Sequence, residues 1–363
     1  MTMTSDYDAH MMSASAREKG ANVFVWYRLT QNIDKVRICW RADEHNPLTV
    51  AKLYRYVDTV VREDYGMQYQ RWPYVLLAVD IEPSADAIVR YRTRYKSDTP
   101  TLLARGSDEV LEPGDYAFYM PERSKNSIPT LTFMRLRTFF AEYQALIVRY
   151  PRLAFPPSTE LRDAAFEMQR GKCLFTGAAL NRDQDKTVAI WYLPPFFSYL
   201  VNITPYHERL DIHGEIIQNN NLCEKLENIG NCLVTSQEIA ELLWNNKVAV
   251  DVEDDYRIIY FDQRNPDTIN FKSYLQFPNS PSQLNDDYIR GQFKYSLQRN
   301  IQGGDVRDDF ALDAPEDFLE SRNGELEEED EEEYDFTNEV WQTGMGKVVH
   351  DWLLRYPELY GEF

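Results

Sequence analysis

Three short segments in the second half of this 363-residue chain decide how the rest is interpreted: RGKCLFTG at residues 170–177, WYLPP at 191–195 and NCL at 231–233. Before the first segment, the Ser-Thr-Glu of residues 158–160 predicts the cap of a helix over 161–169, which the glycine of the first segment ends. The apolar residues that lead into the second segment predict a strand. The third segment precedes another helix, for which Thr235 is the predicted N-cap and Glu238 the third helical position.

The residues of these segments resemble the HNH-type nuclease domain that is widespread in fungal proteins. In that family an Arg-Asp helix, here at Arg162-Asp163, leads into a strand that ends in Cys-x-x-Thr-Gly. A later strand carries the first histidine shortly before a proline, and an asparagine segment opens the helix that carries the last histidine. The resemblance spans residues 162–261 and extends to a helix that ends at Gln302-Gly303-Gly304. It implies a ββα-type domain whose frame positions are Cys173, Thr176, Gly177, Trp191 and Asn231.

The chemistry of that family needs groups that this sequence lacks at the matching positions. HNH nucleases hydrolyse phosphodiester bonds with a divalent cation, and the resemblance implies that the first histidine is the general base and the last one a metal ligand. Trp191 stands in the first position, and its indole nitrogen only donates hydrogen bonds. The last position falls at about Ala240, which has no lone pair to offer a metal. The resemblance therefore implies a degenerate active site.

Two groups of residues support the alternative hypothesis of an active site at a displaced position. His207 and His213 lie in an inserted segment between the second and third segments, although their spacing fits no usual zinc pattern. Glu238 and Glu241 lie near the position of the last histidine, and their carboxylate oxygens suit a hard cation. If the chain is a nuclease, Mg²⁺, Mn²⁺ or Zn²⁺ is expected with it; otherwise we expect no cofactor.

We therefore expect a non-catalytic scaffold or protein-interaction protein derived from an HNH domain, and no enzymatic activity. The alternative is a divalent-metal-dependent nuclease with a displaced active site. The fold class expected is α+β, with a β-rich leading module before the HNH-like domain.

The leading module is predicted at residues 21–125. Apolar, β-branched and aromatic runs predict strands at residues 23–27, 36–40, 74–79 and 116–120, and a helix of three-and-four spacing follows Pro47. The polar residues 1–20 show no period and are expected to be disordered. Residues 131–157 predict a helix and a proline hinge that lead into the HNH-like domain, placed at residues 158–303.

The acidity of the chain is concentrated near its C-terminus. The formal net charge is −20, and the segment from Asp305 to Asp335 carries −14 of it, including seven consecutive acidic residues at 327–333. Such runs are normally disordered, so residues 304–338 are expected to form an acidic linker. Residues 339–363 are rich in tryptophan, valine and leucine and predict a helical segment that folds back onto the body or onto a partner.

Composition restricts the partners and the compartment. No dense basic stripe is present, which argues against nucleic acid as a partner. An unknown protein is expected instead, and the acidic run would suit a basic one. No apolar run approaches the roughly 20 residues of a membrane helix, and no signal core is present. The four cysteines have no C-x-x-C spacing. We therefore expect an intracellular protein with reduced thiols, and the sequence does not separate nucleus from cytoplasm.

Overall fold

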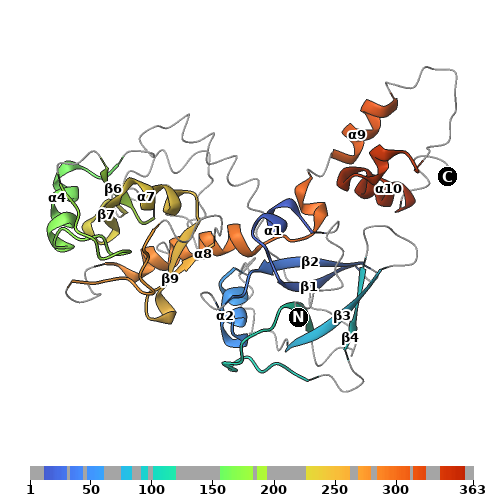
Figure 1. The fold of residues 1–363 in the computed structure, drawn as a ribbon, viewed down its shortest axis with the longest axis horizontal. Coiled ribbons are helices and arrows are strands. Elements are labelled where there is room, and N and C mark those ends of the chain that lie inside the picture. The colour runs from blue at the N-terminus through green and yellow to red at the C-terminus, as the bar shows by residue number, and fades with distance from the viewer. Residues whose placement is uncertain are drawn as a thin grey trace, which may run out of the picture. The chain divides into compact units, whose positions relative to one another are not determined.

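The computed structural model describes residues 12–30, 33–43, 47–60, 75–83, 91–96, 101–119, 156–182, 186–193, 226–261, 269–278, 284–310, 314–323 and 336–355. The chain divides into two compact units. One consists of Met1–Phe133 together with Ile301–Phe363, and the other of Met134–Asn300. Both units contain helices and strands (Figure 1), so the predicted α+β class is confirmed.

The first unit is built on a closed five-stranded barrel with the strand order β1-β2-β4-β3-β5. All neighbouring strands are antiparallel except β1 and β5, which run parallel. In some of these strands apolar residues alternate with polar ones, and in others the apolar residues are continuous. The first pattern is typical of a strand buried on one face and the second of a strand buried on both. Their bounds are β1 Val23–Thr30, β2 Ile33–Trp40, β3 Val75–Pro83, β4 Tyr91–Tyr95 and β5 Gly114–Tyr119.

Four of these strands coincide with those predicted from the sequence, and β4 was not predicted. The segment of β4 reads Tyr-Arg-Thr-Arg-Tyr, and its arginines are exposed while Tyr91 is buried. Arg94 forms an ion pair with Glu82 of the neighbouring β3, at 2.6 Å. The alternation is therefore that of a half-buried strand whose outer face is charged.

The predicted helix is also confirmed, as α2 (Val50–Val60), and it buries the face that carries Leu53 and Val57.

The chain that follows the second unit, from Ile301 onward, belongs to the first unit and pairs with strand β2 of the barrel. Gln302 pairs with Ile38 of β2, and the Gly303 amide donates to the Arg37 carbonyl at 3.0 Å. Gly304 has a φ of +116°, and a Cβ there would lie 2.7 Å from a methyl group of Val36. A glycine is therefore required at residue 304 by both conformation and space.

The expectation of a disordered N-terminus is wrong from residue 12 onward. The short helix α1 (Ala14–Glu18) is capped by Ser13, whose hydroxyl accepts from the Ala16 amide at 3.1 Å. The Ser13 amide donates to the Gly304 carbonyl at 2.8 Å. A helix of five residues is not stable by itself. Contacts with a distant part of the chain hold it, and the local sequence does not reveal them.

The expected acidic linker is likewise wrong for part of its length, since residues 304–338 contain η8 (Val306–Asp309) and the helix α9 (Ala314–Asn323). The acidic run at 327–333 lies outside the described residues.

The C-terminal prediction of a helix is confirmed by α10 (Gly344–Arg355), which follows η9 (Glu339–Gln342). Val348 of α10 packs against the barrel core, so this helix does fold back onto the unit. A small apolar cluster joins α9, η9 and α10 through Leu319, Trp341, Val349 and Leu353.

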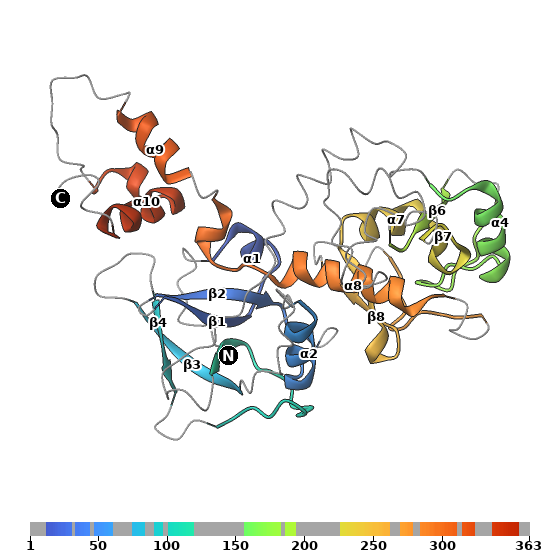
Figure 2. The same cartoon turned by 180° about the vertical axis from the view of Figure 1, so that it is seen from behind.

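The second unit contains two separate two-stranded antiparallel sheets, β6–β7 and β8–β9, with helices packed against them. Figures 1 and 2 both show β6 and β7 between α4 and α7; α4 contacts β7, and α7 contacts both strands. The predicted helix at 131–150 lies outside the described residues. The elements are α4 Thr159–Met168, β6 Thr187–Trp191, η4 Ile229–Asn231, β7 Cys232–Ser236, α7 Gln237–Trp244, β8 Val248–Asp251, η5 Val252–Asp254, β9 Arg257–Tyr260 and α8 Asp286–Ile301.

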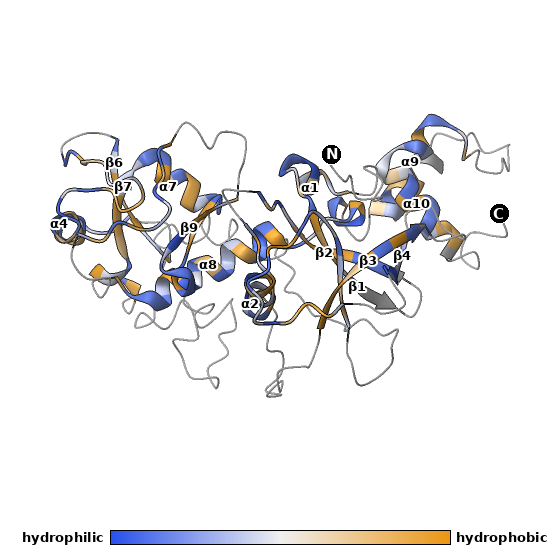
Figure 3. Cartoon of the chain, turned by 60° about the horizontal axis from the view of Figure 1, so that its bottom comes forward, coloured by the Kyte–Doolittle hydropathy of each residue, from blue (hydrophilic) through white to orange (hydrophobic). Residues whose placement is uncertain are grey.

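The helices α7 and α10 separate apolar from polar faces, as colouring by hydropathy makes visible (Figure 3). No helix of the described residues combines the length and the apolar character needed to cross a bilayer.

Candidate functional site

The segment Cys173–Gly177 forms a tight turn before β6. The Cys173 amide donates to the Ala178 carbonyl, and the Gly177 amide donates to the Cys173 carbonyl, each at 2.8 Å. Gly177 adopts a left-handed conformation with φ +71°, and the Thr176 hydroxyl accepts from the Ala178 amide at 3.3 Å. The Thr-Gly pair therefore shapes the turn, and its polar groups are used within it.

The side chain of Cys173 points into the core of the unit. It is buried, and its sulfur lies 3.4 Å from the Thr235 hydroxyl. Thr235 is also fully buried and does not cap α7. The cap is Ser236, whose hydroxyl accepts from the Ile239 amide at 3.4 Å, so the predicted cap was one residue too early.

The pleat of the β6–β7 pair separates the two positions at which the resemblance places histidines. Side chains of successive strand residues point to opposite faces. Trp191 ends β6 opposite Cys232, and its 8% exposed indole packs with Ala165 of α4 on one face. Ala240 of α7 is completely buried in the cluster that covers the other face, together with Ile190. The backbone pair therefore lies between the two positions.

Asn231 is fully buried at the start of β7 and fixes the chain on both sides of the strand pair. Its side-chain amide donates to the carbonyls of Leu193, at 2.7 Å, and Leu226, at 2.9 Å. Its oxygen accepts from the Leu193 amide at 2.9 Å. These bonds hold the backbone just after β6 and just before η4.

Gln169, the C-cap residue of α4, covers the outer edge of β7 and was not singled out from the sequence. Its side-chain oxygen accepts from the Val234 amide, and its nitrogen donates to the Val234 carbonyl, both at 2.8 Å. The same nitrogen also donates to the Lys172 carbonyl at 3.1 Å. One buried glutamine thus replaces the two backbone bonds that a third strand would make at this residue. A glutamine at a helix end carries no sequence signal for that role.

Two of the candidate metal ligands, Glu238 and Glu241, lie within the described residues. Glu238 and Glu241 are exposed on α7, and the carboxylate of Glu241 accepts from the Gln237 side chain at 3.0 Å. His207 and His213 lie outside the described residues. Among the residues that are described, no three histidine, cysteine, aspartate or glutamate side chains are grouped so as to hold a metal ion.

The buried thiol and phenol next to the strand pair are held in their neutral forms. Burial, and secondarily the neighbouring Cys173, raises the pKa of Tyr192 far above its ordinary value. Burial raises the pKa of the Cys232 thiol to about 12. A nucleophile or a general base needs a pKa nearer neutrality. Neither side chain is therefore suited to either role.

Comparison of the chain with protein-family models, with curated proteins and with solved structures gave no match.

The edge role of Gln169 leads to a prediction for stability. Gln169→Leu keeps a similar volume but leaves the amide and carbonyl of Val234 buried without partners. An unsatisfied buried polar group costs about 1–3 kcal/mol. We expect the free energy of unfolding, measured by denaturant titration, to fall by roughly 2–4 kcal/mol. Gln237→Leu on the exposed face of α7 is the matched control, with an expected change within about 0.5 kcal/mol. Equal losses in the two variants would contradict the edge role.

Proposed function

We propose that this protein is a non-catalytic interaction or scaffold protein whose second unit derives from an HNH-type domain. The order of two antiparallel strands followed by a helix, β6–β7–α7, supports this ancestry. So do the turn at Cys173–Gly177 and the bracing of the backbone by Asn231. The turn and the asparagine shape the backbone of the domain, and their polar groups are hydrogen-bonded within it.

The observation that carries the non-catalytic part of the proposal is the burial of Trp191 and Ala240 in apolar clusters on opposite faces of the strand pair. A general base must reach the solvent or the substrate, and a metal ligand must share an ion with its partners. Residues at these two positions meet neither condition. Glu238 is exposed and belongs to no group of three possible metal ligands among the described residues.

A surface on α7 supports the interaction part of the proposal. Trp244 is 59% exposed at the end of the helix, and Glu241 lies one turn before it. Residues three and four positions apart share one face of a helix, so the indole and the carboxylate are presented together. An exposed indole attracts lysine or arginine groups to its ring face, and carboxylates attract the same groups by charge. This pairing suits a basic protein partner.

The non-catalytic proposal is tested by incubating the full chain with plasmid and single-stranded DNA in the presence of excess Mg²⁺, Mn²⁺ or Zn²⁺. We expect no cleavage above the level of a variant that carries His207→Ala, His213→Ala and Glu238→Ala, because Trp191 stands at the position of the base and the described residues form no metal-binding group. Products are followed by gel electrophoresis. Cleavage by the parent chain that the triple variant loses would establish the nuclease alternative instead.

The interaction proposal is tested by titrating a lysine- and arginine-rich peptide into the full chain and measuring its affinity by calorimetry. Trp244→Ala should weaken binding about fivefold to tenfold, since cation–π contacts at exposed sites contribute roughly 0.5–1 kcal/mol and the contact area of the ring is lost as well. Leu102→Ala is the matched control, because Leu102 is also 59% exposed but lies in the first unit. Equal affinities for the parent and Trp244→Ala would rule out this surface.

A further inference from the structure

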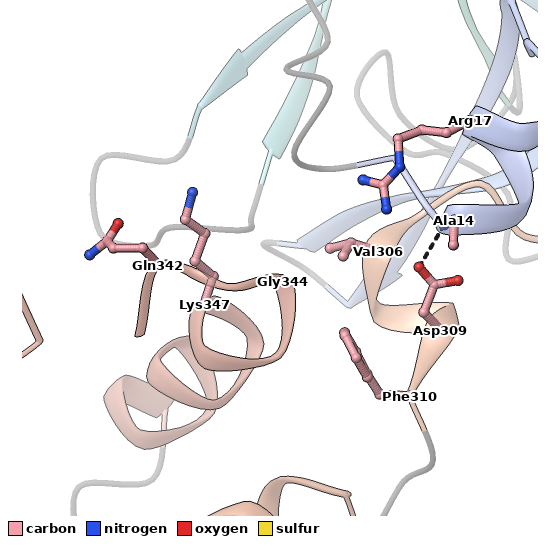
Figure 4. A pocket seen from close by; sticks show the side chains of 8 residues that line it. All are labelled: Ala14, Arg17, Val306, Asp309, Phe310, Gln342, Gly344 and Lys347. Carbon is pink, nitrogen blue, oxygen red and sulfur yellow. Dashed lines mark hydrogen bonds between the residues drawn. The ribbon is translucent and has the colours of Figure 1, made fainter. Parts of the chain in front are cut away.

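The first unit contains a cavity that no part of the proposed function uses. Its volume is about 330 Å³, and its walls come from α1, η8 and the η9–α10 segment (Figure 4). These three segments lie far apart in the sequence, and η8 contacts both α1 and α10. Since one packed core holds these walls together, the cavity belongs to the folded unit.

The floor of the cavity is apolar, and the space above it exists because residue 344 has no side chain. Val306 is 3% exposed and belongs to the barrel core, and the ring of Phe310 packs against the same core. A Cβ added to Gly344 would lie 3.4 Å from a methyl carbon of Val306 and 3.7 Å from the tip of Phe310. Any larger side chain at residue 344 would therefore occupy the cavity.

The rim of the cavity carries positive charge. Arg17 extends from α1 on one side, and Lys347 and Gln342 come from the η9–α10 segment on the other (Figure 4). The single acidic residue of the lining, Asp309, is engaged with the backbone, since one of its oxygens accepts from the Ala14 amide at 2.6 Å. The lining thus carries two cationic side chains and one carboxylate, a formal excess of one positive charge.

We propose that this cavity binds a small organic anion, a carboxylate or a phosphate ester carried on one aromatic or branched apolar group. The apolar part would lie against Val306 and Phe310, and the anionic group would accept a hydrogen bond from Lys347, with the charge of Arg17 on the other side of the rim adding to the attraction. Hydrogen bonds between charged groups of this kind are short and strong. The volume is near the lower end of ligand pockets, which span roughly 300–1,000 Å³, so a ligand of one ring suits it better than a nucleotide.

Calorimetric titration of the full chain tests this inference with four ring compounds of similar size. Benzoate and phenyl phosphate carry the two anionic groups, benzamide is the neutral analogue of benzoate, and benzylamine is the cationic one. We expect saturable binding of at least one anion and at least tenfold weaker binding of benzamide and benzylamine, because a charge-assisted hydrogen bond contributes more than about 1.4 kcal/mol, a factor of ten. The stronger of the two anions identifies the ligand as a carboxylate or a phosphate.

Variants of the lining then locate the site. Lys347→Gln should weaken binding of the anion about tenfold and leave benzamide unaffected. Gly344→Val should abolish binding by filling the cavity, and its melting temperature shows whether the unit stays folded. Lys96→Gln, an exposed lysine of the same unit away from the cavity lining, should bind like the parent. Absence of saturable anion binding, equal binding of benzoate and benzamide, or parental affinity in Lys347→Gln would each overturn the inference. The proposed function concerns the other unit and does not depend on this result.

Discussion

A two-stranded sheet is not stable alone in water, and this constraint governs the second unit. The β6–β7 pair needs cover on both faces and at its open edge. Trp191 and Ala165 provide apolar packing with α4 on one face, and α7 packs on the other through Ile239 and Ala240. Gln169 satisfies the edge at Val234. Both faces of the described strand pair are therefore buried in apolar clusters.

Several polar side chains in this region have a structural use. Asn231 connects the backbone after β6 to the segment before η4, and Ser236 caps α7. The buried Cys173 lies against Thr235. If the second unit derives from an HNH-type domain, as we propose, it keeps the residues that shape turns and strand ends, whereas Trp191 and Ala240, at the positions of the imidazoles, are packed in the core. Function is accordingly sought on the surface of α7 and, independently, in the cavity bounded by Gly344.

Sequence patterns predicted the elements whose stability is local. The strands β1 and β2, the helix α2 and the helix α4 follow from periodicity and capping. The edge role of Gln169 was not predicted because it depends on a contact between residues 65 positions apart. The helix α1 was missed for the same reason, since Asp309 holds the Ala14 amide from 295 positions away.

The separation of Trp191 from Ala240 also required the structure, because the pleat decides which face each residue occupies and the packing decides which helix covers that face. The central claim is that these two positions cannot share a metal ion. It is tested most directly by thermal unfolding of Trp191→His, Ala240→His and the double variant, each with and without Zn²⁺. The account predicts that each substitution lowers the melting temperature and that Zn²⁺ stabilises the double variant no more than the single ones. A zinc-dependent rise in melting temperature confined to the double variant would contradict it, because both imidazoles would then have to reach one ion.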